Sequence, residues 1–240
     1  MIRDTVPDIW VYLATTPLFA LLLTLVAYQI GMALHVRSGF MAIVNPVLLA
    51  ILIVVGVLLL TDTGYQTYFD GAQFVHFLLG PATVALAVPL YRQFERIRKS
   101  WKAILASLVA GSLTSILTAV GIARLFSAPG DIVTALAPKA ATTPVAMAIT
   151  EALGGPPSLS AVFVLMTGML GAMLGPALLS LLRIDDPASR GLALGTASHG
   201  IGTARAFQES EVTGAFSGLA MGLNAIATAL LLPLLWYWLA

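Results

Sequence analysis

The chain has 240 residues, of which 59% are hydrophobic and only 10% are charged, and its formal net charge is +1. Soluble domains carry about 25% charged residues, so this composition and a mean hydropathy of +0.95 indicate an integral membrane protein. The small net charge gives no electrostatic basis for binding nucleic acid. The absence of cysteine excludes disulfides, thiol nucleophiles and thiolate metal sites.

Apolar segments follow one another along the whole chain. A helix needs about 20 apolar residues to cross the hydrocarbon layer. The candidate segments are 9–30, 42–60, 72–91, 103–123, 132–150, 157–182, 191–207 and 212–239. The sequence therefore predicts an all-α membrane bundle of about seven or eight segments, with residues 1–240 forming a single membrane domain.

The loops between these segments differ in charge, which predicts their side of the membrane. The stretch "YRQFERIRKSWK" (91–102) is strongly basic and is expected to be a cytoplasmic loop, as are 31–41 and 183–190. The loop 61–71 and the acidic "QESE" (208–211) are expected to be external. These assignments agree only if 132–150 is re-entrant or otherwise irregular, with the amino terminus outside and the carboxyl terminus inside. A full crossing would leave one of the later loops in conflict with the charge rule.

Two parts of the chain share one pattern. Residues 42–123 and 157–239 each give a clean apolar segment, an interrupted one and another clean one. Matching breaks in oppositely oriented halves are typical of transporters with inverted repeats. We therefore expect two inverted repeats with two broken, crossing helices, and treat 9–30 and 132–150 as additional segments. The alternative is a plain bundle whose Gly and Pro residues are tolerated kinks.

The stretch "ALAPKAATTPVAMAIT" (135–150) contains a lone cation in an apolar segment, and such groups suggest function. Pro138 and Pro144 disfavour continuous helix around Lys139. Thr142 and Thr143 can cap the helix that Pro144 opens. A helix amino terminus, an ammonium and two hydroxyls make a small anion site. The alternative is that Lys139 extends from an interfacial loop to the lipid headgroups.

The stretch "TASHGIGTARAF" (196–207) is the second unusual segment. Gly200 and Gly202 permit a positive φ or a close backbone approach. The amino terminus of a half-helix is expected near residues 200–203, which include Thr203. His199 can bond a carboxylate or carry a proton, or it can be a structural histidine bonded to a backbone carbonyl. Arg205 is expected to reach the external interface.

The stretch "LLGPATVALAVPL" (78–90) interrupts the first predicted repeat. Gly80 and Pro81 are expected to break the helix and Thr83 to cap the half-helix that follows; a simple proline kink is the alternative. His76 is expected to face the external vestibule. In the last segment, Asn224 can bind a ligand or satisfy unwound backbone, and the second role is favoured.

Other residues bear on packing and on chemistry. Glycines four residues apart, namely Gly171 and Gly175, and Gly214, Gly218 and Gly222, predict close helix packing. Ser198 is adjacent to His199, but no acidic partner motif or nucleophile elbow accompanies them. We expect no enzymatic activity, no cofactor and no metal site.

Four stretches occur in order with family-like spacing. They are "LLGPATVALAVPLY", "PKAATTPVAMAI", "HGIGTARA" and "GAFSGLAMGLNAIATALLLPLL". On these the chain resembles the LrgB/CidB family of bacterial membrane proteins from about residue 40 onward. One departure is Ala140 and Ala141, where the family pattern suggests a serine and a larger residue.

The resemblance implies a function and partners. The family has been described as antiholin-like, acting on murein hydrolases with a small LrgA/CidA partner, while a chloroplast relative transports glycolate and glycerate and bacterial relatives are implicated in pyruvate movement. It therefore implies a carrier for small monocarboxylates in the bacterial inner membrane, with a holin-like or antiholin-like role as the alternative. The expected substrate contacts are Lys139, Thr142, Thr143, His199, Gly200, Gly202, Thr203, Gly80, Thr83 and Asn224. A homo-oligomer is also expected, because few segments are left to support a moving core.

Overall fold

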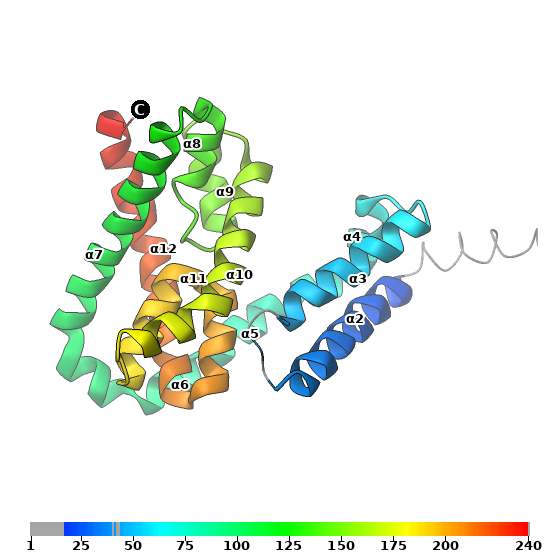
Figure 1. Ribbon diagram of the computed structural model, residues 1–240, viewed down its shortest axis with the longest axis horizontal. Coiled ribbons are helices and arrows are strands. Elements are labelled where there is room, and N and C mark those ends of the chain that lie inside the picture. Colours follow the sequence, from blue (N-terminus) through cyan, green and yellow to red (C-terminus); the bar gives the residue numbers. More distant parts are fainter. Residues whose placement is uncertain (1–16, 40, 42–43, 240) are drawn as a thin grey trace, which may run out of the picture. The chain divides into compact units, whose positions relative to one another are not determined.

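The computed structural model describes residues 17–39, 41 and 44–239 (Figure 1). Every regular element in these residues is a helix, in agreement with the predicted class. The chain divides into two compact units, with the boundary between Ala85 and Leu86. The first predicted repeat, 42–123, contains residues of both units, so the two predicted repeats stay a prediction.

The first unit contains four described helices. They are α2 (Pro17–Arg37), α3 (Pro46–Leu60), α4 (Tyr65–Phe77) and α5 (Leu79–Ala85). Helix α2 contacts both α3 and α4, and the Thr24 and Tyr68 hydroxyls lie 2.8 Å apart between α2 and α4. The predicted loop 61–71 is partly helical, because α4 already begins at Tyr65. The start of the predicted segment 9–30, residues 9–16, lies outside the described residues.

A short interruption separates α4 from α5. It falls at Leu78, and Gly80 and Pro81 lie in the first turn of α5. Proline disturbs the turn that precedes it, because its ring crowds the carbonyl four residues earlier. Thr83 lies in the interior of α5, so the prediction that it caps this helix is wrong. The side chain of His76 is outside what the structure describes.

The second unit contains seven helices among its described residues. They are α6 (Ala87–Arg92), α7 (Phe94–Leu125), α8 (Gly130–Leu136), α9 (Thr143–Ala152), α10 (Pro157–Leu181), α11 (Pro187–Glu209) and α12 (Glu211–Leu239). Helices α7, α10 and α12 are long and apolar enough to cross a membrane, as are residues 18–37 and 65–92. The predicted basic loop 91–102 is mostly the start of α7, so its charges lie on helix rather than loop.

The two ends of the second unit can be told apart by what packs there. At the basic end, where α7 begins, Ile104 and Leu108 pack with Ala188 of α11 and Phe216 of α12. At the far end, where α7 stops, residues of α7, α8, α9 and α12 form another apolar cluster: Ile116, Val120, Ala123, Val133, Ala137, Ile149 and Leu232. In Figure 1 α8 and α9 lie in the upper part of this unit and α11 in the lower part.

Helices α8 and α9 form a helical hairpin, called here the first hairpin (130–152). The residues between them, 137–142, are not helical, and Val133 of α8 shares a cluster with Ile149 of α9. Gly155 lies so close to Thr134 that an added Cβ would be 2.7 Å from its methyl group. In one straight helix these positions would be about 30 Å apart, so the chain returns to the far end from which it entered. Segment 132–150 is therefore irregular and folds back on itself, and its re-entrant placement in a membrane stays a prediction.

Helix α11 is also folded back on itself and is called here the second hairpin (187–209). Its backbone leaves helical geometry at His199, with φ 42° and ψ −131°. Arg190 in its first turn and Glu209 at its last residue form an ion pair with N···O 2.8 Å. A straight helix would separate these residues by about 28 Å. Both ends of α11 therefore lie at the basic end.

This fold-back corrects part of the charge-based topology. The predicted external loop 208–211 lies at the same end as 91–102, because Glu211 pairs with Arg92 at 3.1 Å, and the crossing expected for 191–207 is absent. The end of α12 consequently lies at the far end, opposite the basic residues and not beside them as predicted. Acidic residues contribute little to membrane orientation, so "QESE" was a poor guide to the outside.

Candidate functional site

The tip of the first hairpin is a buried, non-helical loop of small residues. Pro138 and Ala141 are fully enclosed and Ala140 is 4% exposed. Two turn hydrogen bonds shape the loop: the Lys139 N–H donates to Leu136 at 3.1 Å, and the Ala141 N–H donates to Pro138 at 2.9 Å. Ala141 packs against Val164 of α10. The alanines that depart from the family pattern are therefore the residues that fit this tip into the unit.

Lys139 projects from this tip toward α7. Its partly buried side chain donates from Nζ to Ser115 Oγ at 3.3 Å. Ser115 lies ten residues before the end of α7, which is about 15 Å inside along the helix. This contact disfavours the alternative in which the ammonium extends to the headgroups. Among the described residues no carboxylate pairs with it, so two of its three N–H groups are available to a ligand.

Two hydroxyls follow Lys139 at the start of α9. Thr142 occupies the N-cap position and Thr143 begins the helix, with Pro144 next, as the sequence predicts. The Thr142 side chain makes no capping hydrogen bond; instead its carbonyl accepts from the Ala146 N–H at 2.8 Å. The predicted capping by these hydroxyls is therefore wrong. Within the described chain neither hydroxyl has a hydrogen-bond partner, which leaves both for a ligand.

His199 forms the tip of the second hairpin. The sequence predicted a break in this segment, with a positive φ at one of the glycines. In the structure the residue with the positive φ is His199. Its Nε2 lies 2.9 Å from the Val164 carbonyl and must donate to it, and Gly168 leaves room for the ring. The structural role that was the alternative for His199 is the one seen.

Residues near His199 differ in how they contact the protein. Gly202 is in close contact with Ser198 and the Leu194 carbonyl, whereas Gly200 has space around it. Thr203 Oγ1 donates to the His199 carbonyl at 2.9 Å and lies 3.0 Å from Ser217 Oγ. These contacts hold the turn in place.

The two tips meet at Asn224 of α12. Its Nδ2 donates to the Ala140 carbonyl at 2.9 Å and to the Thr196 carbonyl at 3.2 Å. Both N–H groups of the amide are thus used by backbone, which is the favoured of its two predicted roles. The predicted contacts Gly80 and Thr83 and the predicted helix break Pro81 belong to the other unit and are not placed relative to these tips.

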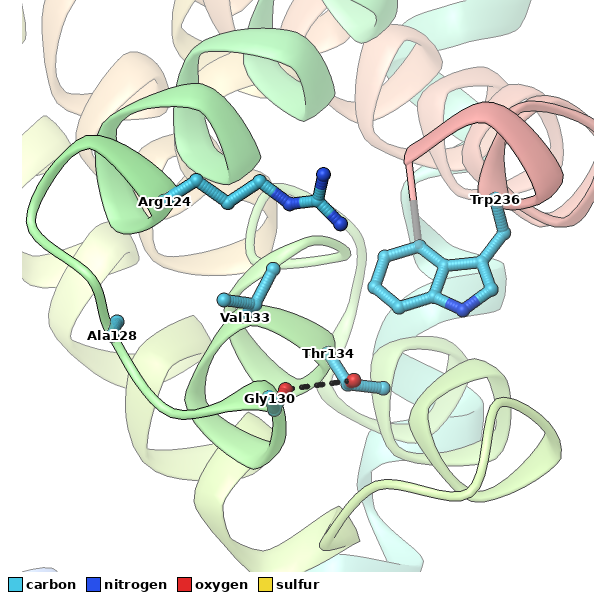
Figure 2. A pocket seen from close by; sticks show the side chains of 6 residues that line it. All are labelled: Arg124, Ala128, Gly130, Val133, Thr134 and Trp236. Atoms are coloured by element: carbon cyan, nitrogen blue, oxygen red, sulfur yellow. Dashed lines mark hydrogen bonds between the residues drawn. The ribbon is translucent and has the colours of Figure 1, made fainter.

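Several relevant residues were missed from the sequence. Ser112, Ser115 and Thr228 lie in segments that looked uniformly apolar, and their small hydroxyls gave no signal beyond their position within a membrane span. A cavity of about 360 Å³ at the base of the first hairpin was also not foreseen. Figure 2 shows Arg124 extending toward the side of this cavity where Trp236 lies. Its lining residues are Arg124, Ala128, Gly130, Val133, Thr134 and Trp236, none of them a predicted site residue.

Comparison with known proteins connects this arrangement to one family. The profile of the LrgB-like family matches residues 24–238, nearly the whole chain. The chain belongs to the LrgB-like family.

The alignments of this LrgB-like protein with individual relatives cover most of this chain and most of each relative. It is 38% identical to "Uncharacterized protein YwbG" of Bacillus subtilis (strain 168) over 191 residues, 80% of this chain and 85% of the relative. It is 31% identical to "Antiholin-like protein LrgB" of Bacillus cereus (strain B4264) over 219 residues, 91% of this chain and 95% of the relative. No solved structure matches the chain. Family and helices together establish a multi-pass membrane protein of the LrgB-like family.

Proposed function

We propose that this LrgB-like protein is a transporter of small monocarboxylates, of the glycolate, glycerate, lactate or pyruvate type, that works by alternating access. One observation carries the proposal: two hairpins enter the second unit from opposite ends, and their tips share Asn224. Broken or unwound segments that meet near the bilayer midplane are the usual substrate sites of secondary transporters.

The arrangement suits a carrier better than a simple pore. Non-helical backbone at membrane depth is stable only where it is buried or lines a polar cavity. Here each hairpin separates the tips from one end of the unit, so displacement of one hairpin at a time would open one side at a time. We propose an inverted pair made of α7 with the first hairpin and α10 with the second hairpin. Its boundaries differ from the repeats expected from sequence.

The substrate chemistry follows from the first tip. A monocarboxylate needs one positive charge and a few hydrogen-bond donors. Lys139 supplies an ammonium without a carboxylate partner among the described residues, and Thr142 and Thr143 supply hydroxyls. In this proposal His199, Gly200, Gly202 and Thr203 form the opposing backbone wall. The contribution of Gly80 and Thr83 stays a prediction, because they belong to the other unit.

The setting and partners belong to the same proposal. We propose a bacterial inner-membrane location, which family membership and the apolar helices support. A small LrgA/CidA-like membrane partner and a homo-oligomer are proposed on the family resemblance and on the small number of full spans.

A second candidate is an antiholin-like regulator of cell lysis. The name "Antiholin-like protein LrgB" given to relatives from Bacillus cereus and Bacillus anthracis supports this function, whereas the hairpin geometry supports the carrier. The two functions differ in what crosses the membrane. An assembly that regulates or forms a lytic pore would pass large solutes without saturation.

Both functions can be measured on the purified full-length protein in liposomes. A carrier gives saturable uptake of labelled glycolate, lactate or pyruvate that an excess of unlabelled carboxylate inside accelerates, and it retains an entrapped dye. An antiholin-like pore component gives dye leakage or affects leakage by a holin partner. Absence of saturable uptake for all these acids, with leakage present, would overturn the carrier in favour of the second candidate.

A further inference from the structure

The centre of the second unit contains a buried polar cluster built around Asn224. Asn224 has no exposed surface, and Ser112 and Thr228 are 1% and 2% exposed. Ser112 Oγ donates to Asn224 Oδ1 at 2.8 Å and lies 3.2 Å from Thr228 Oγ1. Burying polar side chains in an apolar bundle costs free energy unless they form hydrogen bonds. The groups that these hydrogen bonds connect therefore explain why the cluster is present.

The two N–H groups of Asn224 go to different hairpins. One donates to Ala140 in the non-helical first tip. The other donates to Thr196, three residues before the backbone turn at His199 in the second tip. Carbonyls left without a donor at this depth are expensive, so the amide stabilises both tips at once.

The chemistry of the side chain suits this double role. An amide is the smallest uncharged group with two N–H donors and an acceptor. Ser112 can only donate to Oδ1, which fixes the orientation of the amide and directs both donors toward the tips. Aspartate has the same shape but no N–H, and threonine offers a single hydrogen.

We propose that Asn224 is a positioning residue that couples the two hairpin tips, so that loosening one tip loosens the other. The coupling itself does not depend on what the protein carries. Its consequence for turnover rests on the proposed transport function. Two tips held at a fixed distance from each other form one substrate site, which can open to one end of the unit and then to the other. Without the amide, each hairpin would fluctuate separately.

The test is hydrogen–deuterium exchange of the full-length protein in nanodiscs, read for peptides covering residues 137–143 and 196–203. Asn224→Asp should raise exchange at both tips about tenfold or more, while the middle of α10 stays as in the unchanged protein. Ser112→Ala and Thr228→Val, which keep both tip hydrogen bonds, should raise it much less. Faster exchange at only one tip, or at neither, would overturn the coupling.

A second variant covers loss of folding, and a transport assay separates the two proposals. If Asn224→Asp is not recovered folded, Asn224→Thr, which keeps a single donor, should still raise exchange at both tips and leave the middle of α10 unchanged; faster exchange at only one tip, or at neither, would overturn the coupling. In liposomes the folded variants should lose maximal uptake rate more than apparent affinity. Failure of uptake in the unchanged protein would sink the transport function and leave the exchange result standing.

Discussion

The two hairpins of the second unit reach the same residue, but they are secured in different ways. The base of the first hairpin is apolar and packs into the far-end cluster with α7 and α12. The base of the second hairpin is closed by Arg190 and Glu209, whose side chains are only 13% and 17% exposed. Arg96–Asp186 and Arg92–Glu211 add ion pairs on either side of it.

Their tips differ as well. The first tip carries an ammonium and two hydroxyls that can still bind a ligand, whereas His199 and Thr203 of the second tip are hydrogen-bonded within the protein. The lesson is a division of labour. In the proposed carrier, the first hairpin supplies the groups that bind the substrate, and the second supplies a fixed wall opposite them.

The largest expected effect tests the difference in ligand-binding groups between the two tips. Lys139→Met keeps most of the volume of the side chain and removes its charge, so uptake of small carboxylates in liposomes should fall by roughly a hundredfold, as for loss of a charged contact. Lys99→Met removes an exposed lysine from the basic end and should leave uptake unchanged. Equal uptake by Lys139→Met and the unchanged protein would remove Lys139 from the site.

The next effect concerns the ionic base of the second hairpin. Glu209→Gln leaves the mostly buried Arg190 without its charged partner and should lower the free energy of unfolding by about 3 kcal/mol. Glu211→Gln breaks an exposed pair, with 49% and 64% of the side chains accessible, and should cost less than about 1 kcal/mol. Thermal unfolding in the same detergent measures both. Similar costs would contradict the view that Arg190–Glu209 closes the hairpin.

A smaller effect tests the packing of the second hairpin against α12. A Cβ at Gly195 would collide with the Ser217 carbonyl, so Gly195→Ala should destabilise by about 1–3 kcal/mol. Gly222 has open space around it, and Gly222→Ala should be neutral or stabilising by up to about 1 kcal/mol. Melting temperatures that move equally for the two variants would be inconsistent with this close approach.

The smallest effect is a pH dependence at the start of the second hairpin. The Ser189 backbone N–H, helped by the Ser189 hydroxyl and by Arg96, holds the pKa of Asp186 below its ordinary value of 3.8. A carboxyl with a lowered pKa stabilises the fold above about pH 3.8, and this is lost as the pH falls through its folded pKa. Asp186→Asn should therefore lose less stability than the unchanged protein between pH 5 and pH 3. An identical loss would exclude this contribution.

Some of this arrangement could be predicted from the sequence and some could not. Composition predicted helices, and the prolines around Lys139 predicted a break in the helix there, because proline acts on its own backbone neighbours. The position of Lys139 within an apolar segment was enough to single it out. These are local effects that need no knowledge of the neighbouring helices.

The fold-back of α11 depends on contacts that are distant in sequence. From the sequence, Arg190 and Glu209 are assigned to loops on opposite sides of the membrane, whereas in the structure they form an ion pair. His199 adopts a positive φ, which is more usual for glycine, and its ring is held by the Val164 carbonyl. Ser112 and Thr228 matter only through their approach to Asn224. These features depend on tertiary contacts, which the residue types alone do not predict.

The central claim is that the hairpins enter from opposite ends, and single cysteines test it most directly because the chain has none of its own. Asp185→Cys lies just before the second hairpin, Gln208→Cys lies at its end and Asp131→Cys lies at the base of the first, all at exposed positions. With a membrane-impermeant maleimide applied to intact and permeabilised cells, positions 185 and 208 should label from the same side and position 131 from the other. Labelling of 185 and 208 from opposite sides would contradict the account.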